Sequence, residues 1–225
     1  MVRRCCFPKS SSRRSGSPSS LLHGLMLQKT GAPFRWRHVL GSAVLILVLM
    51  ALISHPLVPE GTLLHGVMDA AGFMFYLAGL GFRFWATLYV GGRKGSSVIA
   101  EGPYSVCRNP LYLGSFLLAI ASALFIQSWV FAVGIVAASL FYIMATVPRE
   151  ERHMRDGHGE EYVQYCRRVP RFVPRFSLYH SPPEITVSTK GLWIECRRIF
   201  PWLWIPLVGE LIAHLRSQPW MPHYF

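Results

Sequence analysis

The sequence predicts an all-α fold: an integral membrane bundle of four to five transmembrane helices, with a charged cytosolic helical segment toward the C-terminus. Composition is the first reason, because 52% of the 225 residues are hydrophobic and only 15% are charged, whereas soluble domains carry about 25% charged residues. The second reason is the stretch 111–147, which contains no charged side chain. The third is that basic residues gather between apolar stretches, as they do on the cytosolic side of membrane proteins.

The N-terminal segment 1–37 holds eight Lys or Arg and no acid, and it is rich in Ser, Gly and Pro. Such a segment cannot bury a core, so we expect a disordered, basic cytosolic tail. Nucleic-acid-binding proteins can share the net charge of +12, but basic residues that flank membrane spans explain it, and we expect no nucleic-acid partner. Whether Met1 or Met26 is the true start stays open.

The first two predicted spans are 38–58 and 67–90. The stretch "HVLGSAVLILVLMALISHPLV" is long enough, as a helix, to cross a hydrocarbon core of roughly 30 Å. A short connection without Lys or Arg, residues 59–66, separates it from the second apolar stretch.

Residues 111–147 provide two further helices of about 18 residues each, near the lower limit for crossing. The best hinge is at 127–129, so we predict a tight helical hairpin. The tail, the loop 91–110 and the segment after Val147 are basic, whereas the connection 59–66 and the hinge are not. The positive-inside rule therefore predicts a multi-pass protein whose N-terminus and basic loops face the cytosol.

Residues 148–180 differ from the spans, because five of the eleven acids fall between Glu150 and Glu161, interleaved with arginines. We expect a charged helix that is broken near Gly157 and Gly159 and ended by "PRFVP".

The later segment 199–215 is apolar but contains two prolines and Glu210. It is either a fifth span or a helix that lies in the membrane interface. We divide the chain into the tail 1–37, a transmembrane domain 38–176 and a membrane-associated extension 177–225.

Arg83 lies inside the second predicted span. An arginine there costs about 2.5–3.5 kcal/mol on insertion scales and usually faces a partner or a wet cavity. Snorkelling toward the nearby cytosolic end is an equally good explanation. For Gly79 and Gly81, which precede it, close helix packing is the better explanation than room for a ligand.

The loop "EGPYSVCRNPLYLG" (101–114) enters the third span. Pro110 suits the first turn of a helix, and a helix start exposes unpaired N–H groups and partial positive charge. With Arg108 beside it, and hydroxyls from Tyr104 and Tyr112, this end suits a carboxylate or phosphate.

Glu150 and Glu151 follow the fourth span on the same side of the membrane. Adjacent residues of a helix do not share a face, so one carboxylate can serve a ligand and the other a neighbouring arginine. Loop and acid pair together could hold a zwitterion. We expect no metal site, because His153 and His158 lack the i, i+4 spacing of a helical metal pair and the five cysteines lack metal-ligand spacing.

These segments together resemble the isoprenylcysteine carboxyl methyltransferase family and the related phospholipid N-methyltransferases. The similarity covers roughly residues 70–176 and comprises "GLGFRFWATLYVGG", the 101–114 loop, the charge-free hairpin and "EERHMRDGHGEEYVQYCRRVPRFVP". The resemblance implies membrane helices and a pocket for S-adenosylmethionine near the cytosolic surface.

The family loop commonly reads Arg-His-Pro, and here it reads Arg108-Asn109-Pro110. Because asparagine cannot titrate, we expect Asn109 to position a ligand or a neighbouring side chain and not to carry a proton. The loop and the resemblance together predict these cofactor contacts: Tyr104, Arg108, Asn109, Pro110, Tyr112, Gly114, Glu150, Glu151, Tyr162 and Tyr165.

Methyl transfer needs no covalent enzyme intermediate. The enzyme should therefore accelerate the reaction by aligning the reactants and by excluding water from them. A carboxylate on a lipid-linked or hydrophobic acceptor is the favoured substrate, with Arg83 and Arg168 as candidates to position it. The alternatives are methylation of a phospholipid amine and a non-enzymatic membrane scaffold or transporter. The oligomeric state stays open.

Overall fold

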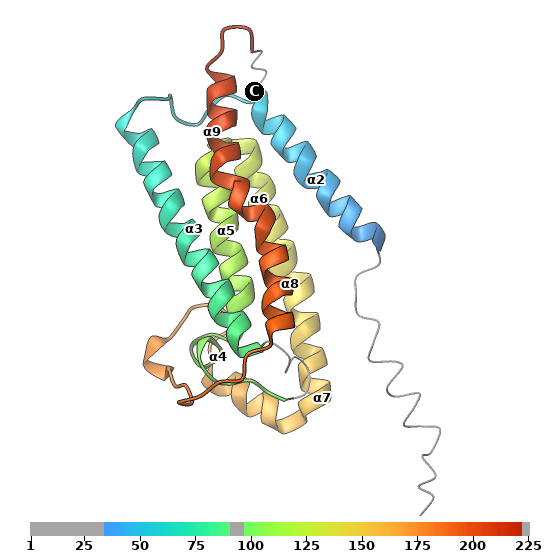
Figure 1. The fold of residues 1–225 in the computed structure, drawn as a ribbon. Helices are drawn as coiled ribbons and strands as arrows, with labels where there is room; N and C mark the ends of the chain where they lie inside the picture. The colour runs from blue at the N-terminus through green and yellow to red at the C-terminus, as the bar shows by residue number, and fades with distance from the viewer. Residues whose placement is uncertain (1–33, 91–96, 222–225) are drawn as a thin grey trace, which may run out of the picture. The chain divides into compact units, whose positions relative to one another are not determined.

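The computed structural model describes residues 34–90 and 97–221, with side chains from Ser42 onward. Every regular element in these ranges is helical and none is a strand, which confirms the all-α prediction (Figure 1). The chain forms two compact units, Met1–Val44 and Leu45–Phe225, and one helix begins in the first and ends in the second. All helices that hold the candidate site belong to the second unit.

The helices follow the predicted order with shifted ends. The first one begins within the predicted tail and ends before Pro56, whose ring disfavours helical backbone just ahead of it. The rest of the tail, Met26 and the basic residues Arg93 and Lys94 lie outside the described residues. The elements are α2 (Phe34–Leu52), α3 (Leu63–Val90), α4 (Pro103–Val106), α5 (Pro110–Ile126), α6 (Trp129–Phe141), the π-helix η1 (Tyr142–Thr146), α7 (Val147–Arg168), the 3₁₀-helix η2 (Phe176–Leu178), α8 (Thr189–Ile199), the 3₁₀-helix η3 (Phe200–Trp204) and α9 (Ile205–Arg216).

Two helical runs are long and apolar enough to cross a membrane: Leu63–Val90, and Trp129–Arg168, which joins α6, η1 and α7. Their most apolar windows have mean hydropathies of 1.4 and 2.3, and only 17% and 11% of those windows is buried inside the protein. The core helix of a soluble protein would be mostly buried, so these exposed apolar faces favour contact with lipid. Pro110–Ile126 is a shorter apolar helix. The number of crossings stays a prediction.

The predicted hinge between the third and fourth apolar helices is confirmed, because only Gln127 and Ser128 separate α5 from α6. Gln127 ends α5 in the left-handed conformation, with φ 48° and ψ 48°. Ser128 caps α6, and its Oγ accepts a hydrogen bond from the backbone N–H of Phe131 at 3.5 Å. The Gln127 side chain donates to Asp69 Oδ1 at 3.2 Å, which ties the hairpin to the start of α3.

α7 is the predicted charged helix. Gly159 adopts the non-helical backbone angles φ 55° and ψ −130°, so the predicted break is confirmed at this glycine. The helix ends at Arg168, and Val169 is extended, as the following proline favours. The π-helix η1 was not predicted. It lies directly before the acid pair, and a π-turn shifts the faces on which the following side chains lie.

Helices α3 and α5 lie side by side (Figure 1) and approach closely where two glycines face each other. A Cβ on Gly79 would lie 2.9 Å from the carbonyl oxygen of Gly114, and a Cβ on Gly114 would lie 2.9 Å from that of Gly79. The packing role expected for Gly79 is confirmed. Gly81 does not share it, since nothing lies within 4 Å of a Cβ built there.

Replacing Gly79 with valine should therefore destabilise the bundle by about 1–3 kcal/mol, because the new side chain overlaps Leu118 and the α5 backbone. Gly81→Val is the matched control in the same helix and should change stability by only about 0.5 kcal/mol. Heating each variant in detergent and measuring the fraction of protein that remains monodisperse gives the stability of both variants. Equal shifts for the two variants would contradict this description of the α3–α5 contact.

Candidate functional site

The loop before α5 is held by the segment that follows α7. The backbone N–H of Arg108 donates to the Pro170 carbonyl at 2.8 Å, and that of Arg175 donates to the Val106 carbonyl at 3.0 Å. The buried Cys107 thiol lies 3.4 Å from the Arg171 carbonyl. The "PRFVP" segment, predicted only as a helix stop, is thus the support of the loop.

A glycine is required where this loop begins. Gly102 has a φ of 56°, a backbone conformation that other residues rarely adopt. A Cβ there would lie 2.3 Å from the Tyr89 ring, so a side chain has no room either. The Gly102 N–H donates to the His180 carbonyl at 2.8 Å, which fixes the entry of the loop.

Glu151 joins the loop to α7. Arg171 Nε lies 3.1 Å from both carboxylate oxygens of Glu151, Asn109 Nδ2 donates to its Oε1 at 3.1 Å, and Arg108 Nη1 lies 3.7 Å from Oε1. The predicted loop and acid pair are therefore adjacent on one side of the protein. Asn109 holds a carboxylate, in keeping with a positioning role. The sequence analysis missed Arg171, although it belongs to the "PRFVP" segment that the family resemblance covers.

The charged residues around Glu151 determine the pKa of its carboxyl group. Burial raises the pKa of Glu151, but hydrogen bonds from Arg171 and the charge of Arg108 outweigh burial, so the pKa lies below its ordinary value. The carboxylate is therefore ionised at neutral pH and acts as a fixed counter-charge for both arginines.

This depressed pKa predicts an acid-labile fold. The contribution of Glu151 to stability is fully present above its unfolded pKa of about 4.5, and is lost as pH falls through the lower folded value. Thermal unfolding between pH 7 and pH 3 should show a fall in stability below about pH 4.5. Glu151→Gln should lower stability at pH 7 and reduce that slope. A variant with an unchanged slope would assign the acid lability to other groups.

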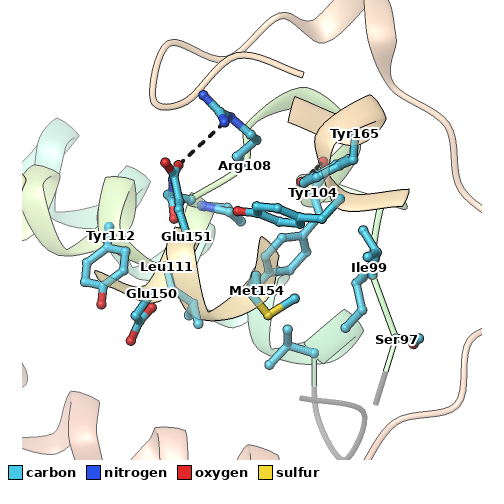
Figure 2. Close-up of a pocket in the computed structure, with 15 residues that line it drawn as sticks. Ser97, Ile99, Tyr104, Arg108, Leu111, Tyr112, Glu150, Glu151, Met154 and Tyr165 are labelled. Atoms are coloured by element: carbon cyan, nitrogen blue, oxygen red, sulfur yellow. Dashed lines mark hydrogen bonds and ion pairs between the residues drawn. The ribbon is translucent and has the colours of Figure 1, made fainter. Parts of the chain in front are cut away.

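Glu150 and Glu151 point in different directions. Figure 2 shows the Glu151 carboxylate directed at Arg108, while the Glu150 carboxylate points away from Arg108 and lies near Tyr112 of α5. Glu150 is exposed and Glu151 is buried. Arginines hold the Glu151 carboxylate, as the sequence predicted for one member of the pair. That Glu150 serves a ligand stays a prediction.

A cleft lies between the loop, the start of α5 and α7. It contains about 730 Å³ of space free of atoms, open solvent included. Apolar side chains such as Ile99, Leu111 and Met154 form much of its wall. The predicted site residues that line it are Tyr104, Arg108, Asn109, Pro110, Tyr112, Glu150, Glu151, Tyr162 and Tyr165.

Three predicted site residues do not line this cleft: Arg83, Gly114 and Arg168. Gly114 packs against α3 instead, with Arg83 Cγ 2.6 Å from the position of a Cβ. Arg83 Nη1 donates to Ser115 Oγ at 2.5 Å, and Arg83 also forms an ion pair with the buried Glu195. Arg168 is exposed at the end of α7. A role for these residues toward a substrate stays a prediction.

The tyrosines of the cleft are neutral hydrogen-bonding groups. Burial raises the pKa of Tyr104 and of Tyr165 above the ordinary value, so neither ionises at physiological pH. Tyr165 Oη donates to the Tyr104 backbone carbonyl at 2.8 Å and so fixes α7 to the loop.

Arg108 retains an unused donor. Its Nε is buried, and no described residue accepts a hydrogen bond from it. The Asn109 side chain, which could have capped α5, turns to Glu151 instead, so the first N–H groups of α5 lack a side-chain cap. Arg108, the uncapped start of α5 and the exposed Glu150 therefore all line the cleft.

Comparison with known proteins identifies the family. The model of the phospholipid methyltransferase family matches residues 69–161, which include the loop, the hairpin and the acid pair. The cobalt-zinc-cadmium resistance protein CzcN of Cupriavidus metallidurans is 34% identical over 180 residues, which cover 78% of this chain and 80% of that protein. The chain belongs to the phospholipid methyltransferase family.

Two further proteins are similar to this chain. The nickel-cobalt-cadmium resistance protein NccN of Alcaligenes xylosoxydans xylosoxydans is 28% identical over 193 residues, covering 85% of this chain and 90% of that protein. Protein-S-isoprenylcysteine O-methyltransferase B of Arabidopsis thaliana is 26% identical over 77 residues, or 34% of this chain and 39% of that protein. The resemblance inferred from the motifs is confirmed. No solved structure matches the chain.

Proposed function

We propose that this protein is an S-adenosylmethionine-dependent methyltransferase of the membrane, and that the cleft between the 101–110 loop and α7 holds the methyl donor. Family membership supports methyl transfer. The observation that carries the assignment of the site is the split acid pair: Glu151 is held by Arg171 and Asn109, which leaves Glu150 exposed in the same cleft as Arg108.

The residues present fit a ligand that carries both charges. The Arg108 guanidinium and the uncapped start of α5 suit the donor's carboxylate. Glu150 suits its ammonium group, and the apolar wall around Ile99 and Met154 suits the adenosine portion. Tyr104 and Tyr162 offer neutral hydroxyls between them.

The bound donor would supply an electrophilic methyl group on a sulfonium. The chain's own contribution is to bind, to orient and to exclude water. Opposite charges at the two walls fix the donor's direction, and alignment of this kind accounts for much of the rate of such displacements. Buried, neutral Tyr104 and Tyr165 keep the inner end of the cleft dry without adding a competing nucleophile.

The acceptor we favour is a carboxylate on a hydrophobic or lipid-linked molecule, with Arg168 as the candidate positioning residue, because Arg83 is already paired with Glu195. Support comes from the similarity to an isoprenylcysteine O-methyltransferase. A carboxylate acceptor also needs no proton to be removed, and no dedicated base was predicted. A phospholipid amine is the second candidate, because the family model is that of phospholipid methyltransferases.

Membranes that contain the protein, incubated with radiolabelled S-adenosylmethionine, test this function. A labelled lipid-soluble product whose label is released by mild base would support the methyl ester, and an alkali-stable label would support the amine. Glu150→Gln should reduce either signal about tenfold. Well-folded protein that neither binds the donor nor labels any membrane component would favour the scaffold or transporter alternative.

A further inference from the structure

The C-terminal segment 189–216 lies outside the matched family region and has no assigned role. It runs as α8, η3 and α9 without a break in the helical path (Figure 1). One face carries large exposed side chains and the other is buried. The exposed members are Trp193, Phe200, Leu203, Trp204, Leu207 and Leu211, and the buried ones are Glu195, Ile199, Gly209, Ile212 and Arg216.

The first anchor of this segment lies near the cleft end of the bundle. Glu195 of α8 forms an ion pair with Arg83 of α3, and the two side chains are only 3% and 13% exposed. Arg83 also donates to Ser115, in the second turn of α5. Each charge neutralises the other, which lowers the cost of placing both inside a membrane bundle.

The second anchor lies at the hinge end of the bundle. Gly209 packs so closely on α5 that a Cβ there would lie 2.7 Å from Phe125 Cβ. Arg216 is 5% exposed, and its guanidinium donates to the Ile126 carbonyl at 2.9 Å and, from Nε, to the Ala51 carbonyl at 3.0 Å. These carbonyls belong to the last turns of α5 and α2, where the partial negative charge of a helix end favours a cation.

The two anchors fix the direction of the segment. α5 runs from the cleft, past Ser115, to the hinge at Gln127, and α8–α9 follows it from Glu195 to Arg216. The 11, 5 and 12 residues of α8, η3 and α9 reach about 40 Å at a helical rise, more than the roughly 30 Å hydrocarbon core.

We propose that residues 189–216 cross the bilayer as a bent helix. The exposed Phe200–Leu211 face lies against lipid acyl chains, Trp193 lies with Arg197 and Arg198 at the headgroups on the cleft side, and the chain end beyond Arg216 is on the side opposite the cleft. A helix lying in the interface would run across α5 and could not reach both ends of it. Charge agrees with crossing: Lys190, Arg197 and Arg198 lie at the cleft end, and no Lys or Arg occurs from 199 to 215.

Two single-cysteine variants test the proposal in sealed membrane vesicles. Cys5, Cys6, Cys166 and Cys196 are first replaced by serine, and the buried Cys107 is kept. Ser217→Cys then marks the end of α9, and Ser177→Cys, in η2 beside the loop, is the matched control on the cleft side. Both positions are exposed. With a maleimide that cannot cross membranes, we expect one site to be labelled in intact vesicles and the other only after permeabilisation.

Labelling of both sites from the same side overturns the crossing. A second measurement uses the unmutated chain, with alkaline phosphatase or a green fluorescent protein fused after Phe225 in a bacterial inner membrane. If the cleft faces the cytoplasm, the phosphatase fusion should be active and the fluorescent fusion dark. The reverse result would contradict the proposal. Neither readout depends on methyl transfer, so the topology and the proposed function fail separately.

Discussion

Glu151→Ala is expected to destabilise the protein by about 3 kcal/mol and to abolish measurable binding of S-adenosylmethionine. The side chain is 9% exposed and holds Arg171, Arg108 and Asn109, so its removal leaves two cations without their shared counter-charge. Breaking a buried pair by removing one partner typically costs about 3–5 kcal/mol, and the partial exposure of Arg171 places this case at the lower end.

Thermal unfolding without ligand measures the stability effect, and calorimetric titration at a temperature where the variant is folded measures binding. Glu160 is an exposed acid of the same helix, and it does not line the cleft. Glu160→Ala should therefore leave both the stability and the binding of S-adenosylmethionine unchanged. A stable Glu151→Ala protein would show that the loop and α7 are held together without this carboxylate.

Glu150→Gln is expected to weaken binding of S-adenosylmethionine about tenfold and to leave the unfolding temperature unchanged. A hydrogen bond to a charged group contributes about 1.5–3 kcal/mol, and solvent exposure of Glu150 places its contribution near the lower limit. No described residue forms a salt bridge with Glu150. The Tyr112 hydroxyl does interact with the Glu150 carboxylate, but a glutamine side-chain oxygen can still accept that hydrogen bond, so the substitution should act on ligand binding.

The contrast between the neighbouring substitutions is the informative result: Glu150 affects binding alone, and Glu151 affects binding and stability together. Purified variants in one detergent allow a direct comparison by calorimetry and thermal unfolding. The same loss of stability in both would mean that the acid pair acts as a single structural unit, contrary to the split seen in the cleft.

Local patterns in the sequence predicted much of this fold. The charge-free stretch and its Gln127 hinge, the Gly159 break and the helix start at Pro110 all depend on residues close together in the chain, and all three are confirmed. The split of Glu150 from Glu151 follows from the same kind of reasoning, because neighbours on a helix point about 100° apart.

What the sequence did not predict depends on distant partners. Arg83 lies in α3 and its partner Glu195 in α8, and only packing of the bundle brings them together. Arg216 caps two helix ends far away in the chain. No local pattern encodes such pairs, so Arg83 was interpreted as a substrate-positioning residue or a snorkelling one, while its structural partner went unnoticed. The π-helix η1 also has no local signature in composition.

A calorimetric comparison of S-adenosylmethionine with an analogue that lacks only its α-amino group tests whether Glu150 binds the donor's ammonium group. If Glu150 holds the ammonium, Glu150→Gln should weaken binding of the natural donor about tenfold and leave binding of the analogue unchanged. Equal losses for both ligands, or no binding of the donor by well-folded wild-type protein, would contradict the proposed site.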